Sequence, residues 1–563
     1  MSASIWIKKL TLNDGTSLDL GKNDIVLFVG PNNAGKSVAL QRIHELFSAQ
    51  GDSRIPIVRT LEVQRDGTEE DLREWVNKNC QKGQKNGTDF VVTKQGLGHW
   101  LSSLTQLWNT TDSGPNALGG FFSSWAAAGN RLEVANPAQA INILQEAFTD
   151  PIHYLYVNEL LEERLSKSFK EAFALDLLVN RLAGSQISLH CGTRPSISAG
   201  EDRLSVNYLK QIYALPALHG QGDGMRSFVG CLLLATVIDH SVVLIDEPEA
   251  FLHPPQARLL GRMLAKDKPA GRQLFVATHS GDFLRGLISV QPSNIRVLRI
   301  RRDGSINPVR ELKPDRVRQL WKDSLLRYSH VLDGLFHERV VLCEGDSDCR
   351  FYEGVADALL DNTPEVTRPA VMFIHCGGKQ RMPVIIDSLT NLGVPLRVVV
   401  DFDVLQAEQP LRKIYELLGG NWETVKADWE YVNKTVIQMK AELSTSGVKR
   451  ELAQILDPIK ENAFPDSAAR AVREVVKKTS AWSFIKTTGR AGLPNGQPTQ
   501  ALDRLLLHCT AKGLYIVEVG ELEGFDRSSD SHGPAWVNTV LEKSLASDTG
   551  LEEARRFVIK LIS

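Results

Sequence analysis

A glycine-rich stretch near the N-terminus carries the residue types that can hold a nucleoside triphosphate. It reads Gly-x-x-x-x-Gly-Lys-Ser over residues 30–37, directly after the apolar run 25–29 and before a helical stretch at 38–47. Glycines let consecutive N–H groups point at phosphate oxygens, the lysine adds a positive charge for the β- and γ-phosphates, and the serine hydroxyl can bind Mg²⁺. The flanking strand and helix make a chance turn a poor explanation. The residues expected to contact the nucleotide are Gly30, Asn32, Asn33, Gly35, Lys36 and Ser37.

Two later apolar runs end in side chains that suit ATP hydrolysis. Residues 242–245 lead into Asp246 and Glu247, and residues 273–278 lead into His279. Ligands of parallel α/β sheets bind at the carboxyl ends of the strands. We therefore expect Asp246 to hold Mg²⁺, Glu247 to polarise the attacking water and His279 to lie near the γ-phosphate.

A glycine-rich turn lies between these motifs, at residues 218–227, and precedes an apolar helix expected at 228–238. Such a turn can present N–H groups and a helix N-terminus to a phosphate. Its candidate phosphate contacts are Gly220, Gly222 and Gly224.

The second half of the chain repeats the pattern of short apolar strands that end in acids. Glu344 follows one such run, with Asp348 four residues further on. Asp401 and Asp403 follow another, and a run between them ends in two glycines and a lysine at 377–379. Alternation along a strand would place Asp401 and Asp403 on one side, where with Glu344 they form an oxygen-rich site for Mg²⁺ or Mn²⁺ rather than Zn²⁺. Each acid pair alone is more typical of a turn or a helix cap, so only their joint order is specific.

The bulk composition is that of an ordinary globular protein. A chain of 563 residues exceeds one domain, and two to four is the usual expectation. No apolar run reaches about 18 residues, and residues 1–20 lack a signal-peptide pattern, so neither membrane spanning nor export is expected. The seven cysteines are scattered without a C-x-x-C pair, and Cys231 and Cys343 are expected to be reduced core thiols. The expected location is the cytoplasm.

The net charge of −2 argues against a globally basic nucleic-acid-binding surface. Basic side chains gather instead at residues 296–327 and 466–490. Solvated helix faces explain such clusters as well as phosphate contacts do, so the two interpretations stay open.

The sequence predicts an α/β protein with two domains. The first covers residues 1–310 and contains a helical insertion at about 138–185, which suits a dimerisation arm or a plain pair of core helices. Residues 311–335 are expected to be a linker. The second domain covers residues 336–563, with a helical insertion at about 405–511.

The motifs of the first half, in their order, resemble those of ABC-type ATPases of the SMC-like branch. Residues 30–37 match Walker A, residues 242–247 match Walker B with its catalytic glutamate, His253 lies in the D-loop region and His279 matches the switch histidine. The signature departs, because His-Gly-Gln-Gly-Asp-Gly stands at residues 219–224 where transporters carry LSGGQ. The resemblance implies at least a homodimer, in which the partner's signature completes each ATP site. The chain has no long heptad stretch, which argues against a full SMC arm.

The acids of the second half, in the order Glu-Gly, Gly-Gly and Asp-x-Asp, resemble a Toprim domain. An ABC-type ATPase followed by Toprim resembles the OLD (overcoming lysogenization defect) family of nucleases, including Gabija-type and retron-associated members, over most of the chain. This resemblance implies a further acidic strand after an insertion, and the run at 514–523 fits it. It implies that Glu523, with Glu521 second, joins the metal ligands Glu344, Asp348, Asp401 and Asp403. It also implies a lysine near the C-terminus, for which Lys543 is preferred to Lys560.

The resemblance implies an ATP-regulated DNA endonuclease or nickase that uses two divalent ions and serves in defence against phage. The implied cofactors are ATP and Mg²⁺, with Mn²⁺ possible in the Toprim site. The implied assembly is a homodimer or homotetramer, alone or beside a UvrD-like helicase or a reverse transcriptase and its non-coding RNA. Whether ATP activates or restrains cleavage is left open.

Other functions fit the sequence less well. A topoisomerase needs a nucleophilic tyrosine, and Tyr352 lies inside an expected helix. A primase lacks support, and the Toprim half disfavours a transporter ATPase. A different class of function, an ATP-dependent sensor or scaffold with an inactive Toprim half, is opposed by the complete acid set.

Overall fold

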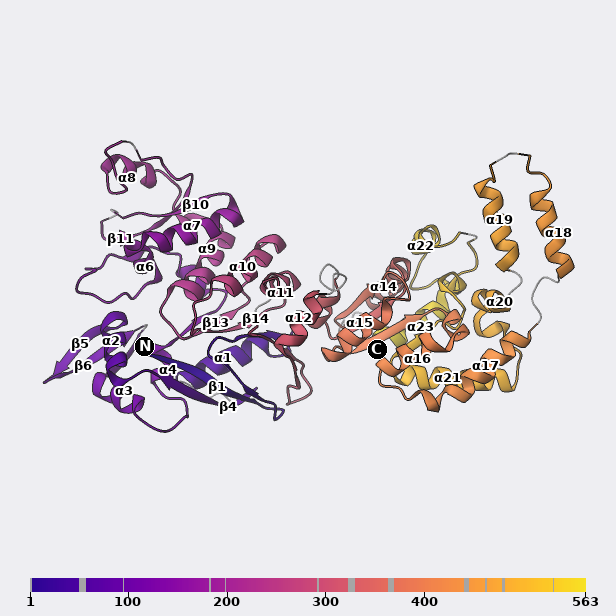
Figure 1. The fold of residues 1–563 in the computed structure, drawn as a ribbon, viewed down its shortest axis with the longest axis horizontal. Helices are drawn as coiled ribbons and strands as arrows, with labels where there is room; N and C mark the ends of the chain where they lie inside the picture. Colours follow the sequence, from indigo (N-terminus) through magenta and orange to yellow (C-terminus); the bar gives the residue numbers. More distant parts are fainter. Residues whose placement is uncertain are drawn as a thin grey trace. The chain divides into compact units, whose positions relative to one another are not determined.

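Buried parallel strands form the centre of the first part of the chain. In the computed structural model, the sheet has the strand order β16-β15-β3-β14-β13-β8, in which only the edge strand β16 is antiparallel to its neighbour. Strands β13 and β14 of this sheet are labelled in Figure 1. Their apolar runs are continuous because both faces of the sheet are covered. The strands are β3 (Ile25–Val29), β8 (Ser123–Ala126), β13 (Val242–Asp246), β14 (Gln273–Ala277), β15 (Ile295–Ile300) and β16 (Val309–Leu312).

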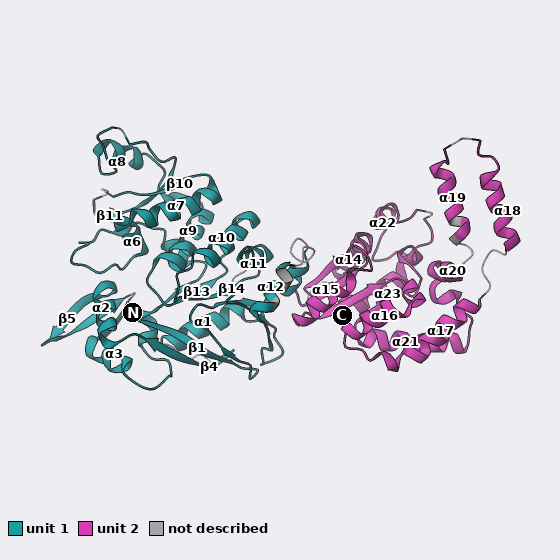
Figure 2. Cartoon of the chain, in the orientation of Figure 1, with its two compact units in different colours: residues 1–336 teal, residues 337–563 magenta. Residues whose placement is uncertain are grey.

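The chain divides into two units, Met1–Phe336 and His337–Ser563 (Figure 2). The domain limits of 310 and 336 expected from the sequence stay predictions, and residues 323–329 of the expected linker lie outside the described part. The structure describes residues 3–49, 57–94, 96–181, 184–197, 199–290, 293–322, 330–362, 369–439, 445–460, 463–477, 481–529 and 531–563.

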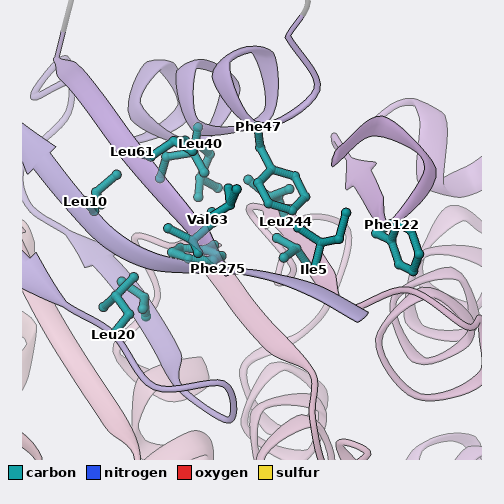
Figure 3. Close-up of a cluster of buried hydrophobic side chains, with 14 of the residues drawn as sticks. Ile5, Leu10, Leu20, Leu40, Phe47, Leu61, Val63, Phe122, Leu244 and Phe275 are labelled. Atoms are coloured by element: carbon teal, nitrogen blue, oxygen red, sulfur yellow. The ribbon is translucent and has the colours of Figure 1, made fainter. Parts of the chain in front are cut away.

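A second, antiparallel sheet packs against the first helix. Strands β1 (Ser4–Leu12) and β2 (Ser17–Asp19) form a hairpin, and β4 (Val58–Asp66) pairs with the other edge of β1. Figure 3 shows the core that joins these layers, with Leu40 and Phe47 of α1 (Lys36–Phe47) beside Leu61 and Phe275. This core fixes the helix that begins at the phosphate-binding motif.

The expected helical insertion is only partly helical. Helices α6 (Pro151–Val157) and α7 (Glu159–Phe173) are present, but the segment before them holds β9 (Ala138–Gln139) and turns. The prediction of helix from residue 138 is therefore wrong. Asp150 accepts the N–H of Ile152, and Pro151 occupies the first turn, so the chain has a strong helix start at that point.

The other elements of the first unit are mostly short. The helices and turns are α2 (Glu69–Asn79), α3 (Leu101–Trp108), α4 (Leu118–Phe121), α5 (Asn130–Glu133), α8 (Val206–Tyr213), η1 (Leu218–Gly220), α9 (Asp223–Leu232), η2 (Leu233–Val237), α10 (Pro254–Asp267), α11 (Gly281–Ile288), α12 (Pro314–Lys322) and η3 (His330–Phe336). The strands are β5 (Gln81–Asn86), β6 (Asp89–Lys94), β7 (Leu97–Trp100), β10 (Asp176–Val179), β11 (Gln186–Ile187) and β12 (Leu189–Gly192).

The second unit is built on a four-stranded parallel sheet in the order β18-β17-β19-β20. Helix α14 packs against β18, α22 and α23, and its side of the core includes the buried rings of Phe351 and Trp536. The strands are β17 (Arg339–Cys343), β18 (Val371–His375), β19 (Leu396–Val400) and β20 (Leu514–Ile516). The helices outside the insertion are α14 (Asp346–Asp361), α15 (Met382–Asn391), α22 (Pro534–Leu541) and α23 (Glu552–Ile562).

The segment between β19 and β20 is mostly helical, as the sequence predicts. Helix α17 packs against α21, and α18 packs against α19 in a hairpin that extends from the rest of this unit in Figure 1. The elements are η4 (Phe402–Gln406), α16 (Glu408–Leu417), η5 (Trp422–Thr424), α17 (Lys426–Gln438), α18 (Thr445–Leu456), α19 (Asp466–Lys477), α20 (Ala481–Thr488), η6 (Gly489–Gly492) and α21 (Gln497–Ala511). After β20 come η7 (Leu522–Phe525) and η8 (Thr549–Leu551).

The cysteines and the lengths of the helices bear on two further expectations from the sequence. All seven cysteines are buried and unbridged, which agrees with core thiols. None of the helices in the described ranges is both long and apolar enough to cross a membrane.

Helices α10 and α11 approach each other through glycines. A Cβ on Gly286 would lie 1.8 Å from the carbonyl oxygen of Arg258, whereas a Cβ on Gly129 would meet no atom within 4 Å. We expect Gly286→Ala to lower the free energy of unfolding of the first unit by about 1–3 kcal/mol, because the helices must separate. Gly129→Ala is the control, with a change of about 0.5 kcal/mol or less. Urea denaturation measures both, and equal effects of the two variants would contradict the close approach.

Candidate nucleotide and metal sites

The turn between β3 and α1 has the backbone of a phosphate-binding loop. Gly30, Asn33 and Gly35 have positive φ angles of 146°, 60° and 96°. A Cβ on Gly30 would lie 2.2 Å from the carbonyl oxygen of Ile300, and a Cβ on Gly35 would lie 2.4 Å from Ile57 Cδ1. Glycine is therefore required at both ends of the loop, and asparagine tolerates the left-handed conformation between them.

Lys36 and Ser37 are held at the mouth of this loop. The buried ammonium of Lys36 donates to the carbonyl oxygens of Gly30 and Pro31, each at 2.9 Å. Burial lowers the pKa of Lys36, although nearby carboxylates oppose that shift. Ser37 Oγ donates to Asp246 Oδ1 at 2.9 Å. The hydroxyl and the carboxylate that we expect to share one Mg²⁺ therefore lie in contact.

The ends of β13 and β14 bring Glu247 and His279 together. His279 Nδ1 lies 3.4 Å from Glu247 Oε1 and 3.5 Å from Glu249 Oε1. Glu249 Oε1 accepts the hydroxyl of Thr278 at 2.8 Å and the N–H of His279 at 2.9 Å. Burial raises the pKa of Glu249. No role was predicted for Glu249 from the sequence, although its place two residues after Glu247 is a usable signal.

Arg131 connects the acidic turn to the helix that follows the glycine-rich turn. Its fully buried guanidinium donates to the carbonyl oxygens of Asp246 and Glu247, each at 2.6 Å, and to Ser227 Oγ at 2.8 Å. Such a planar fork holds three acceptors at once. No local pattern in the sequence distinguishes Arg131, because its partners lie in distant segments.

The glycine-rich turn differs from its predicted form. Helix α9 begins at Asp223 rather than at residue 228, so Gly224 already belongs to its first turn and Gly220 to the preceding short turn η1. Gly222 is extended, and the acid at the following position suits a helix N-terminus. The interpretation of Gly220, Gly222 and Gly224 as phosphate contacts stays a prediction.

The acids of the second unit meet at the carboxyl edge of its sheet. Glu344 follows β17 and Asp401 follows β19, and the N–H of Asp401 donates to Glu344 Oε1 at 3.1 Å. Asp401 precedes the short turn η4, which contains Asp403. The expected alternation along one strand is therefore wrong, and a tight turn brings the two acids to the same edge.

The late acids also lie on a turn rather than on a strand. Strand β20 ends at Ile516, and Glu521 and Glu523 flank the start of η7. The expected strand at residues 514–523 is thus wrong beyond Ile516. Glu523 Oε1 accepts the N–H of Gly533 at 2.8 Å.

Two lysines lie among these acids. Lys379 Nζ donates to Asp403 Oδ1 and lies 3.5 Å from Glu344 Oε2. Lys486 Nζ, from the inserted helix α20, lies 3.3 Å from Asp403 Oδ2 and 3.7 Å from Glu521 Oε2. In the sequence, Lys379 stands out only as the end of a glycine run, and Lys486 only as part of a basic segment.

The lysine preferred from the sequence lies elsewhere. Lys543 Nζ donates to Asp526 Oδ2 and, at 2.7 Å, to Ser528 Oγ. The carbonyl oxygen of the alternative, Lys560, accepts from Arg397. The structure therefore places Lys379 and Lys486 against the acids, and Lys543 against Asp526.

Burial and mutual repulsion shift the pKa values of these carboxylates. Burial, followed by the charges of Glu344 and Asp348, raises the pKa of Asp401 to about 8. Burial also raises the pKa values of Glu344 and Asp348. For Asp403, burial acts in the same direction but is outweighed by the hydrogen bond and charge of Lys379, so its pKa is lowered. The site thus holds more negative charge than its lysines neutralise.

Asp348 has a structural contact of its own, because its Oδ2 accepts the N–H of Gly345 at 2.8 Å at the start of α14. The charge of Glu523 contributes to the raised pKa of Asp348, which places these two acids near each other. Among the described residues, no three His, Cys, Asp or Glu side chains have the arrangement of a formed metal site. The donor set nevertheless fits a hard divalent cation, because every candidate ligand is a carboxylate oxygen.

Comparison with known families finds a match in each unit. Residues 209–285 match a family model described as an AAA domain and named also for the AbiEii toxin of a type IV TA system. Residues 335–403 match the Toprim domain of overcoming lysogenization defect protein-like proteins.

Two curated relatives match parts of the chain. The Old nuclease of Escherichia phage P2 is 22% identical over 172 residues, which are 30% of this chain and 28% of that protein. The uncharacterized protein MJECL11 of Methanocaldococcus jannaschii is 36% identical over 87 residues, 15% of this chain and 76% of that protein. The chain thus spans little more than a quarter of the length of the Old nuclease.

Solved structures with partial similarity include two SMC heads. The SMC head domain from Thermotoga maritima is 13% identical, covers 56% of this chain and 100% of its own, and has a TM-score of 0.29. An SmcHead bound to the C-winged helix domain of ScpA is 14% identical, covers 55% and 98%, and has a TM-score of 0.32.

The raised pKa of Asp401 predicts a pH-dependent stability. Between pH 4 and pH 8 the folded protein keeps a proton on Asp401 that the unfolded chain releases, so the wild type loses stability as pH rises through this window. With chelator present, we expect Asp401→Asn to gain almost nothing over wild type at pH 4 and about 1–3 kcal/mol at pH 8. Denaturation of the second unit at pH 4, 6 and 8 measures this gain.

The exposed Asp457 supplies the matched control, since Asp457→Asn makes the same substitution at the protein surface. We expect Asp457→Asn to change the free energy of unfolding at pH 8 by about 0.5 kcal/mol or less, as surface substitutions usually do. A gain for Asp401→Asn that is the same at pH 4 and pH 8 would contradict the assigned crowding.

Proposed function

Because the chain belongs to the OLD family, in which an ABC-type ATPase domain is joined to a Toprim domain, we propose that it is an ATP-regulated, divalent-metal-dependent DNA endonuclease or nickase. The observation that supports this most is the meeting of Glu344, Asp401, Asp403 and Glu521 at one edge of the β18-β17-β19-β20 sheet. The edge formed by the carboxyl ends of parallel strands is where α/β folds bind ligands.

The charge of this edge suits two divalent ions. Six carboxylates and two ammonium groups leave four negative charges, which two ions such as Mg²⁺ or Mn²⁺ would balance once the acids are ionised. When bound, such a pair supplies a hydroxide nucleophile and stabilises the leaving oxygen of a phosphodiester. The carboxylates are Glu344, Asp348, Asp401, Asp403, Glu521 and Glu523, and the ammonium groups are Lys379 and Lys486.

The protein's own groups have separate tasks in this proposal. Glu344 and Asp401, joined through a backbone N–H, form the centre of the ligand set. Lys379 orients Asp403. The proposed reaction is hydrolysis by water and needs no covalent intermediate. Tyr352 is buried in the core, and burial raises its pKa well above the ordinary value, so it is a poor nucleophile. This argues against a topoisomerase, which needs a reactive tyrosine.

In this proposal the first unit regulates DNA cleavage by the second. Its loop, Ser37, Asp246, Glu247 and His279 bind and hydrolyse ATP with Mg²⁺. The glycine-rich turn at the start of α9 would complete the ATP site of a partner subunit, in a homodimer or homotetramer. A cytoplasmic role in defence against phage, with or without a helicase or a reverse-transcriptase companion, belongs to the same proposal.

The competing function is a sensor or scaffold whose Toprim half is inactive. The four clustered carboxylates oppose it, because crowding buried acids costs stability and groups with perturbed pKa values gather at functional sites. A supercoiled plasmid distinguishes the two functions.

We expect the wild type to nick supercoiled plasmid with Mg²⁺ or Mn²⁺ and Asp401→Ala/Asp403→Ala to be slower by about 1,000-fold or more, since metal binding is lost. Gel electrophoresis of the plasmid measures the rate of nicking. Asp457→Ala, with an exposed acid removed from the inserted helices, is expected to cut at the wild-type rate. If the double variant cuts as fast as the wild type, the nuclease proposal is wrong and the scaffold stands.

A further inference from the structure

The inserted helices of the second unit deliver a lysine to the acidic edge. Lys486 of α20 lies between two acids from different segments, 3.3 Å from Asp403 Oδ2 and 3.7 Å from Glu521 Oε2. Asp403 offers its other oxygen to Lys379, so this carboxylate lies between two ammonium groups. One of these groups comes from the sheet's own loops, and the other comes from the insertion.

The backbone around Lys486 is fixed by a close contact between two glycines. A Cβ on Gly489 would lie 2.1 Å from the carbonyl oxygen of Glu518, and a Cβ on Gly520 would lie 2.1 Å from the carbonyl oxygen of Lys486. Both glycines have positive φ angles, 60° and 107°. The N–H of Arg490 donates to the same oxygen of Glu518 at 2.8 Å. The end of α20 is therefore docked on the segment that carries Glu521.

The core side of α20 supports the same placement. Trp482 and Ile485 are buried, and the helix packs against η4, the turn that contains Asp403. Lys486 is thus held from both sides, by the turn of one acid and by the segment of the other. Such support is what a residue needs to act at a defined point in space.

The side chain of Lys486 is still reachable from solvent, with 38% of its surface exposed. An open cleft of about 760 Å³ begins two residues away at Thr488 and is also lined by Arg490 and Arg527. Arg527 donates to the carbonyl oxygen of Thr487 at 3.2 Å, so it lies beside the end of α20. The charge of this cleft is mixed, because its lining also contains the acids Glu518, Asp526 and Glu553. The two arginines are the groups in it that a phosphate chain could meet beside α20.

We propose that Lys486 is a catalytic lysine that binds the scissile phosphate beside the metal-binding acids. The proposal rests on the nuclease function proposed above. In the hydrolysis, the oxygen of water bonds to phosphorus, the bond from phosphorus to one sugar oxygen breaks, and that oxygen takes up a proton released by the water. Lys486 keeps its own protons and offsets the charge that develops on the phosphate oxygens.

Single-turnover nicking by the full chain, measured over a titration of Mn²⁺, tests this role. We expect Lys486→Ala to lower the rate at saturating Mn²⁺ by about 100-fold without raising the half-saturating Mn²⁺ concentration, because a phosphate contact is lost while the acids remain. Lys486→Arg should cut about tenfold faster than Lys486→Ala, because arginine keeps the positive charge but not the shape of the lysine side chain. Lys434→Ala is the matched control, since Lys434 lies exposed on α17 of the same insertion, and it should match the wild type.

A lysine that only balances the acids would behave differently. Its removal would let Mn²⁺ bind more tightly, so the half-saturating concentration would fall while the rate at saturation stayed at the wild-type value. That result overturns the inference. Thermal melting of each variant separates loss of folding from loss of catalysis, and a folded Lys486→Arg that cuts no faster than Lys486→Ala also counts against a phosphate contact.

The role of Lys486 and the nuclease function on which it rests can be refuted separately. A wild type that leaves the plasmid intact with Mg²⁺ and Mn²⁺ refutes the nuclease function and this role together. A wild type that nicks, beside an inert Asp401→Ala/Asp403→Ala and a fully active Lys486→Ala, refutes the role of Lys486 alone.

Discussion

The mutual repulsion of carboxylates at one sheet edge is the constraint on which the second unit depends. Burial and neighbouring charges raise the pKa of Asp401 to about 8. The fold therefore holds the carboxylates at distances where their charges repel one another. The fold sustains this arrangement with Lys379, Lys486 and a backbone hydrogen bond from Asp401 to Glu344. Cations would relieve the repulsion between these carboxylates, so the site is suited to bind metal ions.

The first unit also holds acids at the ends of parallel strands, but it fixes them with different groups. Its acids also follow parallel strands, but a buried arginine and a buried glutamate fix the turns that carry them. Arg131 holds the backbone of Asp246 and Glu247, and Glu249 ties the end of β14 to the same place. The order that a phosphate loop needs therefore comes from residues that would not touch the nucleotide in our proposal.

Much of the fold could be predicted from the sequence, because apolar runs of five residues that end in glycines or acids mark buried parallel strands. β3, β13, β14, β17, β18 and β19 lie where these runs predict. The tight turns after β19 and β20 were harder to predict from the sequence. Asp403 and Glu521 lie on these turns, because each strand ends sooner than the pattern of alternating side chains suggests. Arg131 and Lys486 could not be predicted, because their partners come from segments far away along the chain, and only the folded backbone brings them together.

The central claim is that DNA is cut in the second unit and that the nucleotide site of the first unit controls the cutting. Plasmid nicking with Mn²⁺, by wild type and Lys36→Ala, with and without ATP, tests it most directly. The account predicts that ATP changes the wild-type rate, that it leaves the Lys36→Ala rate unchanged, and that the two proteins cut equally without nucleotide. Loss of nucleotide-free cutting in Lys36→Ala, or a wild-type rate that ATP does not change, would contradict it.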